Sequence, residues 1–109
     1  MNMADMFGKL TDFQKKMEEV KEQLNHIEVE AEAGGGMVRV TANGNREVTS
    51  IKLDRDIVDP NDTEMLEDLI VAGINQAIRK AEEASQEKMA EITKGMLPGG
   101  LDLGNFGMK

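Results

Sequence analysis

Side chains capable of acid–base or nucleophilic chemistry are few and lie far apart along this chain. The single histidine, His26, has neither a second histidine nor a cysteine to complete a catalytic or metal site. Ser50 and Ser85 lack the Gly-x-Ser-x-Gly context that presents a nucleophile in hydrolases. We therefore predict no catalytic residues and expect a protein that is not an enzyme.

Two other patterns resemble ligand sites but fit structural roles better. Carboxylates concentrate in residues 54–68, yet a calcium loop needs glycine at its sixth position, where counting from Asp59 gives Glu64. Gly34–Gly36 precede a strand-like segment, whereas a phosphate-binding glycine loop follows a strand and opens a helix. We predict helix capping for the carboxylates and a hairpin turn for the glycines. No metal, cofactor or small-molecule substrate is expected.

Basic side chains are the remaining group with binding chemistry. They fall into two sets, one on each segment with helical periodicity, and Lys and Arg are the residues that contact nucleic-acid phosphates. Acidic residues lie among them, which also fits an ordinary solvated helix face. The candidate phosphate contacts are Lys9, Lys15, Lys16, Lys21, Arg79, Lys80, Lys88 and Lys94.

The acidic excess of the chain is unevenly distributed. Its net charge of −8 comes from 21 acidic and 13 basic residues, which taken alone disfavours nucleic acid as a partner. Residues 55–73 hold six acids and one base, whereas residues 74–109 hold five of each. The parts of both predicted helices outside 55–73 are therefore close to neutral.

The composition predicts one small cytoplasmic domain. A length of 109 residues suffices for a single domain. No apolar run approaches the roughly 18 residues of a membrane span, and the N-terminus lacks the apolar core of an export signal. Cysteine is absent, which fits a reducing compartment.

The first helical segment carries one apolar stripe whose spacings alternate between three and four residues. Thr11 and Asp12 offer helix-start chemistry, although the helix can begin earlier, around Ala4–Asp5. The stripe is too short for a free-standing coiled coil, so we expect it to pack on another helix of the fold or of a dimer mate. Its members are Leu10, Phe13, Met17, Val20, Leu24 and Ile27.

Three segments then alternate apolar and polar residues in the manner of strands, namely 28–33, 37–42 and 47–53. Tight turns are predicted at Gly34–Gly36 and at Asn43-Gly44, because these residues tolerate positive φ. The three strands should form an antiparallel meander.

The third of these strands contains an irregularity. Thr49, Ile51 and Leu53 are expected on one face, and Val48 is out of phase with them. This phase break predicts a β-bulge or burial on both faces.

A long second helix is predicted from Thr63 to Lys94, with Pro60 in its first turn and Asp59 or Asp62 as its cap. Its length of roughly 48 Å exceeds a domain radius of gyration of about 13 Å. The helix should therefore overhang its domain or kink at Gly73, and an overhang predicts a homodimer. Its apolar stripe contains Leu66, Leu69, Ile70, Ile74 and Ile78.

The C-terminal end of the chain is rich in glycine and has no periodicity. We predict a single domain over residues 1–95 and a flexible tail over residues 96–109.

Several runs along the chain together resemble the YbaB/EbfC family of bacterial nucleoid-associated proteins. The resemblance extends from about Met6 to Met96 and rests on the order and spacing of the runs. These runs are residues 6–9, 34–44, 47–54, 64–75, 82–83 and 87–89.

The resemblance implies an α+β fold that forms a tweezer-like homodimer, in which the sheets of two protomers join and helices project. It also implies a cytoplasmic, nucleoid-associated protein that binds duplex DNA with loose sequence preference and influences nucleoid organisation or gene expression. Catalysis is not implied. The family supplies no contact code, so the choice of DNA contacts rests on the positions of the basic residues.

A second interpretation keeps the fold and changes the partner. A helix–hairpin–helix order also occurs in prefoldin-like chaperones, and methionine-rich helix faces can hold apolar clients. The alternative is therefore a prefoldin-like chaperone or a protein–protein adaptor without DNA binding. Prefoldin-type helices are, however, considerably longer than the Leu10–Ile27 segment.

Overall fold

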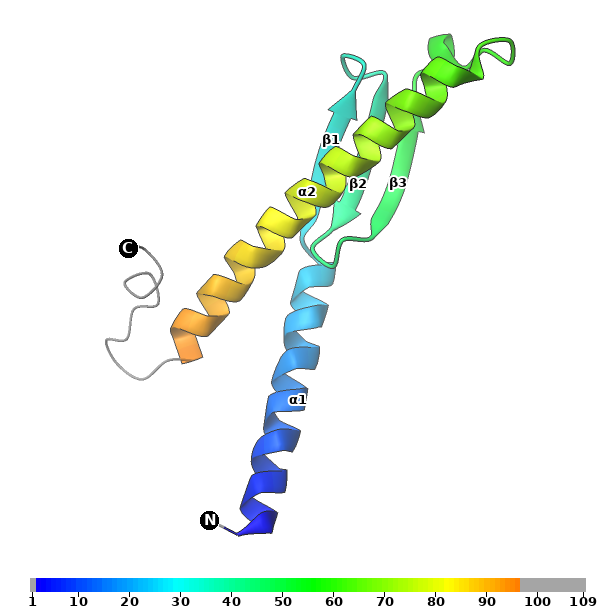
Figure 1. Ribbon diagram of the computed structural model, residues 1–109. Coiled ribbons are helices and arrows are strands. Elements are labelled where there is room, and N and C mark those ends of the chain that lie inside the picture. Colours follow the sequence, from blue (N-terminus) through cyan, green and yellow to red (C-terminus); the bar gives the residue numbers. More distant parts are fainter. Residues whose placement is uncertain (1, 97–109) are drawn as a thin grey trace, which may run out of the picture.

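The computed structural model describes residues 2–96. The described elements, in chain order, are α1 (Met3–Asn25), β1 (Glu28–Ala33), β2 (Val38–Asn43), β3 (Val48–Leu53), the 3-10 helix η1 (Arg55–Ile57) and α2 (Thr63–Met96). The strands form an antiparallel sheet in the order β1-β2-β3 (Figure 1). The predicted helix, three-stranded meander and long helix are confirmed. Apart from Met96, the predicted tail lies outside the described residues.

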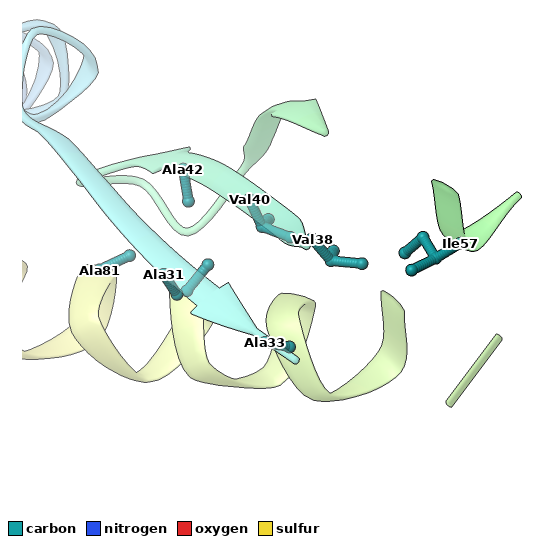
Figure 2. Packing of buried hydrophobic residues seen from close by; sticks show 8 residues of the cluster. Ala31, Ala33, Val38, Val40, Ala42, Ile57 and Ala81 are labelled. Atoms are coloured by element: carbon teal, nitrogen blue, oxygen red, sulfur yellow. The ribbon is translucent and has the colours of Figure 1, made fainter. Parts of the chain in front are cut away.

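Helix α2 covers one face of the sheet and lies mainly over β1 and β2 (Figure 1). Alternate residues of these strands point at the helix, so that Ala31 and Ala33 of β1 pair across with Val40 and Val38 of β2. The resulting core is shown in Figure 2. Its buried members are Ala31, Ala33, Val38, Val40, Ala42, Ile57, Ala77 and Ala81.

Small residues on α2 bring the helix close to the sheet. Ala77 and Ala81 are fully buried, and a Cβ atom placed on Gly73 would lie 2.9 Å from Cγ2 of Val40. Gly73 is therefore explained by close packing, and the kink proposed for it is not needed, since α2 runs without interruption.

The overhang predicted for α2 is confirmed. Its 34 residues span about 51 Å, and the helix extends well past the end of the sheet (Figure 1). The radius of gyration is 20.0 Å, against about 13 Å for a compact chain of this length.

Helix α2 begins at Thr63 as predicted, but the role expected for Pro60 and the C-terminal boundary differ from the sequence prediction. The helix begins at Thr63, so Pro60 lies in a preceding turn and not in the first helical turn. Asp59 stabilises that turn, because its side chain accepts a hydrogen bond of 2.9 Å from the Asn61 N–H. At the other end the helix continues through Gly95 to Met96.

Helix α1 starts earlier than its apolar stripe. Asn2 caps it by accepting a 2.9 Å hydrogen bond from the Asp5 N–H. The start near Ala4–Asp5 is thus close to the observed one, and Thr11 lies inside the helix, where its hydroxyl donates to the Phe7 carbonyl oxygen.

The two hairpin turns behave differently. Gly34, Gly35 and Gly36 all have positive φ, which confirms the turn predicted for them. A tight turn also forms at Asn43-Gly44, as predicted, but neither of these residues has the positive φ expected there. Residues 44–46 form the loop, and the positive φ of +62° falls on Arg46.

The predicted bulge in β3 is confirmed, because Ser50 pairs with Thr41 while Val48 pairs with the next residue, Ala42. The extra residue is Thr49. The apolar face of β3 therefore consists of Val48, Ile51 and Leu53, and the prediction that Thr49 lies on this face is wrong. The second and third strands also begin one residue later than predicted.

Candidate nucleic-acid interface

Two helical arms carry the basic residues singled out from the sequence. Helix α1 and the C-terminal part of α2 leave the sheet at the same end of the molecule (Figure 1). The fold thus places the α1 set, Lys88 and Lys94 on projecting elements, whereas Arg79 and Lys80 lie on the part of α2 that covers the sheet. The α1 set is Lys9, Lys15, Lys16 and Lys21, and the α2 set is Arg79, Lys80, Lys88 and Lys94.

The lysines of α1 are all exposed, but they do not share one face. Lys9 and Lys16 are seven residues apart, which is two helical turns, and therefore lie on one flank of the helix. Lys15 lies about 100° around the helix from Lys16. No single side of α1 therefore carries all four lysines.

The basic residues of α2 include two with partners inside the protein. Lys80 donates a 2.8 Å hydrogen bond to the Glu30 carbonyl oxygen at the outer strand of the sheet. Lys88 lies 3.6 Å from a carboxylate oxygen of Glu91. Arg79 and Lys94 are exposed, which makes them the more accessible pair on this arm.

A groove of about 230 Å³ lies between the two arms. It brings Lys16 together with Glu19 and Glu91, so its charge is mixed. This mixture is poorly suited to one phosphate deep in the groove and leaves the outer flanks of the arms for contacts. The lining residues are Lys16, Glu19, Val20, Gln23, Glu91, Ile92 and Gly95.

Sequence reasoning missed a second basic position, on the sheet face opposite α2. Arg39 and Lys52 are direct cross-strand partners, and they border a shallow cavity. The Arg39 guanidinium is 3.5 Å from a carboxylate oxygen of Glu32 on β1. The alternation within 37–42 and 47–53 could have identified this pair, because cross-strand partners share one face.

The residues considered for catalysis are not assembled into a site. His26 forms the C-cap of α1, where its backbone N–H donates to the carbonyl oxygens of Gln23 and Leu24. Within residues 2–96 there is no cluster of three or more His, Cys, Asp or Glu residues that could hold a metal ion. None of the described helices is both long enough and apolar enough to cross a membrane.

The apolar stripe of α1 is buried at one end only. Val20 and Leu24 are buried, whereas Leu10 and Phe13 are each 57% exposed. Met3, Met6 and Phe7 extend the same face toward the N-terminus, and the sequence analysis missed them because it began the stripe at Leu10. The described chain thus carries an uncovered methionine- and phenylalanine-rich surface, which we call the α1 tip and define as Met3, Met6, Phe7, Leu10 and Phe13.

The stripe predicted for α2 meets the sheet. Four of its members pack against the core cluster, and Ile78 is half-buried. The four are Leu66, Leu69, Ile70 and Ile74.

A second uncovered apolar surface lies on β3. Val48, Ile51 and Leu53 pair across with buried residues of β2 and therefore face the same side as α2, yet they remain 37–41% exposed because α2 lies over the other two strands. β3 is also an edge strand, so the hydrogen-bonding groups on its outer side are unpaired within residues 2–96. We call this surface the β3 face.

Comparisons with known proteins agree on one family. The sequence model described as the YbaB/EbfC DNA-binding family matches residues 1–96. A nucleoid-associated protein of Agathobacter rectalis is 49% identical over 100 residues, which cover 92% of this chain and 88% of the relative. A nucleoid-associated protein of Bacillus cytotoxicus is 46% identical over 101 residues, covering 92% and 93%.

A solved structure shares the fold. The crystal structure of the uncharacterized protein HP0035 from Helicobacter pylori superposes with a TM-score of 0.71 and 22% identity. The match covers 85% of this chain and 98% of that chain.

Proposed function

Since this chain belongs to the YbaB/EbfC DNA-binding family, we propose that it is a nucleoid-associated protein that binds duplex DNA as a homodimer. The single observation that carries the proposal is the projection of two base-bearing helices from one end of the sheet (Figure 1). Two such pairs in a dimer would present four arms to one duplex.

The β3 face is the surface on which we expect two protomers to join. An edge strand pairs readily with a second strand, and burial of uncovered apolar side chains favours association. Joining there would extend the sheet and cover Val48, Ile51 and Leu53. The tweezer-like shape implied by the family resemblance is consistent with such a central layer.

The proposed DNA contacts are phosphate contacts. The eight basic side chains of α1 and α2 are the candidates. The exposed ones that the described contacts leave most accessible are Lys15, Lys16, Lys21, Arg79 and Lys94. Contacts from lysine and arginine to phosphates carry no sequence information, so sequence preference should be loose. A dimer carries twice the chain charge of −8 and therefore repels DNA at long range. The affinity for DNA should thus be modest and should fall steeply as the salt concentration rises.

This proposal places the protein in the nucleoid, where it would influence DNA organisation or gene expression by binding and not by catalysis. The names of the relatives support that location. The family is described by DNA binding, and the arrangement of His26, Ser50 and Ser85 offers no competing chemistry.

One observation favours a second candidate function. The α1 tip exposes five large apolar side chains, each at least 54% exposed, on a projecting helix. Such a surface can hold apolar segments of other proteins. A chaperone or adaptor without DNA binding is therefore the alternative.

A salt-titrated binding measurement separates the two functions. Fluorescence anisotropy is measured with two labelled duplexes, one of random and one of defined sequence. The protein should bind both with similar affinity, and the logarithm of the affinity should fall linearly with the logarithm of the salt concentration. No binding at about 50 mM salt, where phosphate contacts are strong, would contradict the DNA proposal. Suppression of client aggregation in the same preparation would then support the chaperone.

A further inference from the structure

Helix α1 is held at its C-terminal end alone. Of its 23 residues only Val20 and Leu24 are buried, so packing along the arm does not determine its direction. Besides its contacts with α2, α1 is held by the loop between β2 and β3, residues 44–46, which we call the joint.

Two consecutive residues of the joint bind the last turns of α1. The Gly44 N–H donates to the carbonyl oxygens of Leu24 at 2.9 Å and Ile27 at 3.1 Å. The Asn45 side-chain amide donates to the Lys21 carbonyl oxygen at 2.9 Å and also to Oδ1 of Asn25. These bonds satisfy carbonyl groups at a helix end, some of which have no partner inside the helix.

The backbone of the joint lies against the helix as closely as glycine permits. A Cβ atom placed on Gly44 would be 2.7 Å from the Leu24 carbonyl oxygen. Glycine is required at this position by the close approach of α1, since the positive φ of the loop occurs at Arg46.

The third residue of the joint contacts the other arm. Arg46 adopts a left-handed conformation with φ of +62°, which is uncommon for a residue with a side chain. From there its guanidinium lies 3.6 Å from a carboxylate oxygen of Glu82 on α2. The joint therefore connects α1, the sheet and α2 through three adjacent residues.

We propose that Asn45 is a positioning residue for DNA binding, because it fixes the angle between the α1 and α2 arms. This inference rests on the proposed function. An α1 of 23 residues is about 35 Å long, so a rotation of about 10° at the joint moves its far end by about 6 Å. That displacement equals the width of a minor groove, about 6 Å, and would separate the arm from its phosphates.

The absence of cysteine allows a direct measurement of the angle. Spin labels on Thr11→Cys and Glu87→Cys, both at exposed positions, report the distance between the arms by pulsed electron paramagnetic resonance. The labelled chain is diluted in excess unlabelled chain, so that distances between protomers do not contribute. Asn45→Ala should broaden the distance distribution, and Asn61→Ala, an exposed loop control, should leave it unchanged.

DNA affinity is measured on the same variants without labels. Asn45→Ala should weaken binding several-fold and reduce the salt dependence of the affinity by about 0.9 for each phosphate that the arm no longer reaches, while Asn61→Ala binds as the wild type does. Gly44→Ala provides a second route, because its added methyl group must displace α1, and it should act in the same direction.

An unchanged distance distribution in both joint variants would overturn the inference. A broadened distribution with wild-type affinity would overturn the role in DNA binding alone and leave the proposed function standing. A wild-type chain that binds no DNA would overturn the proposed function, and the inference with it.

Discussion

The two long helices of this protein are secured in opposite ways. Helix α2 buries Ala77 and Ala81 completely against the sheet, and Gly73 approaches it so closely that a methyl group would collide with Val40. Helix α1 buries two of its 23 residues and, apart from the half-buried Met17, is otherwise exposed. Stability is therefore concentrated in the sheet and the part of α2 above it.

This difference has a functional consequence. Substitutions on an arm that buries few side chains should have little effect on the free energy of unfolding, whereas most substitutions in a close-packed core lower it. Six of the eight candidate DNA contacts, all except Arg79 and Lys80, lie on the arms, so affinity can be altered there by substitution without loss of the fold. The comparison between packed and projecting helix is open to direct tests.

The largest contrast is expected within α1 itself. Leu24→Ala removes a side chain that is 7% exposed and should lower the free energy of unfolding by about 2–5 kcal/mol. Leu10→Ala makes the same chemical change at a position that is 57% exposed and should cost less than about 0.5 kcal/mol. Urea denaturation of the two variants gives both values. Equal decreases would show that the assembled protein covers the α1 tip.

A smaller decrease is expected where α2 meets the sheet. Gly73→Val adds a side chain where Cγ2 of Val40 is already 2.9 Å from the Cβ position, and overpacking of this kind costs about 1–3 kcal/mol. Ala72→Val is the matched control, because its position is exposed on the neighbouring helix face. Equal urea midpoints for the two variants would contradict the close packing of Gly73.

Much of this architecture was predictable from the sequence, because periodicity reports local structure directly. The alternation in residues 28–33 predicted the strand that carries Ala31 and Ala33, and the phase break at Val48 predicted the bulge as one of two outcomes. The reason expected for the glycine in the Asn43-Gly44 turn, a positive φ, was wrong, because the actual reason is tertiary. Gly44 is required by the carbonyl oxygen of Leu24, which lies twenty positions away in sequence, and no local pattern contains that contact.

The candidate site was predictable in part. Charge and helical periodicity placed the basic residues on two helices, but they could not show that Lys80 is bound to the Glu30 carbonyl oxygen. Alternation could have placed Arg39 and Lys52 on one face of the sheet, whereas their direct pairing depends on strand register. The joint depends on contacts between α1, the loop between β2 and β3, and α2, and no sequence pattern within any one of these segments predicts those contacts.

A test of assembly compares the two faces of β3. Ile51→Asp places a charge on the β3 face and should reduce the mass measured by light scattering from about 24 kDa, twice the chain mass of 12.0 kDa, toward that of a single chain. Ser50→Asp adds the same charge at an exposed position facing the other side of the sheet, and this control should remain dimeric. A dimer that survives Ile51→Asp would place the interface elsewhere.

The smallest expected effect is on DNA affinity, and it should come without a change in stability. The double variant Lys15→Gln, Lys16→Gln removes two exposed cations from each α1, which makes four in the proposed dimer. It should reduce the slope of log affinity against log salt by about four, one for each phosphate contact. Its thermal midpoint should match that of the wild type, because neither side chain is buried. Lys52→Gln removes a cation from the sheet and should leave the slope unchanged. If Lys52→Gln alone reduced the slope, the DNA would lie on the sheet face beside Arg39, and the projecting arms would need another function.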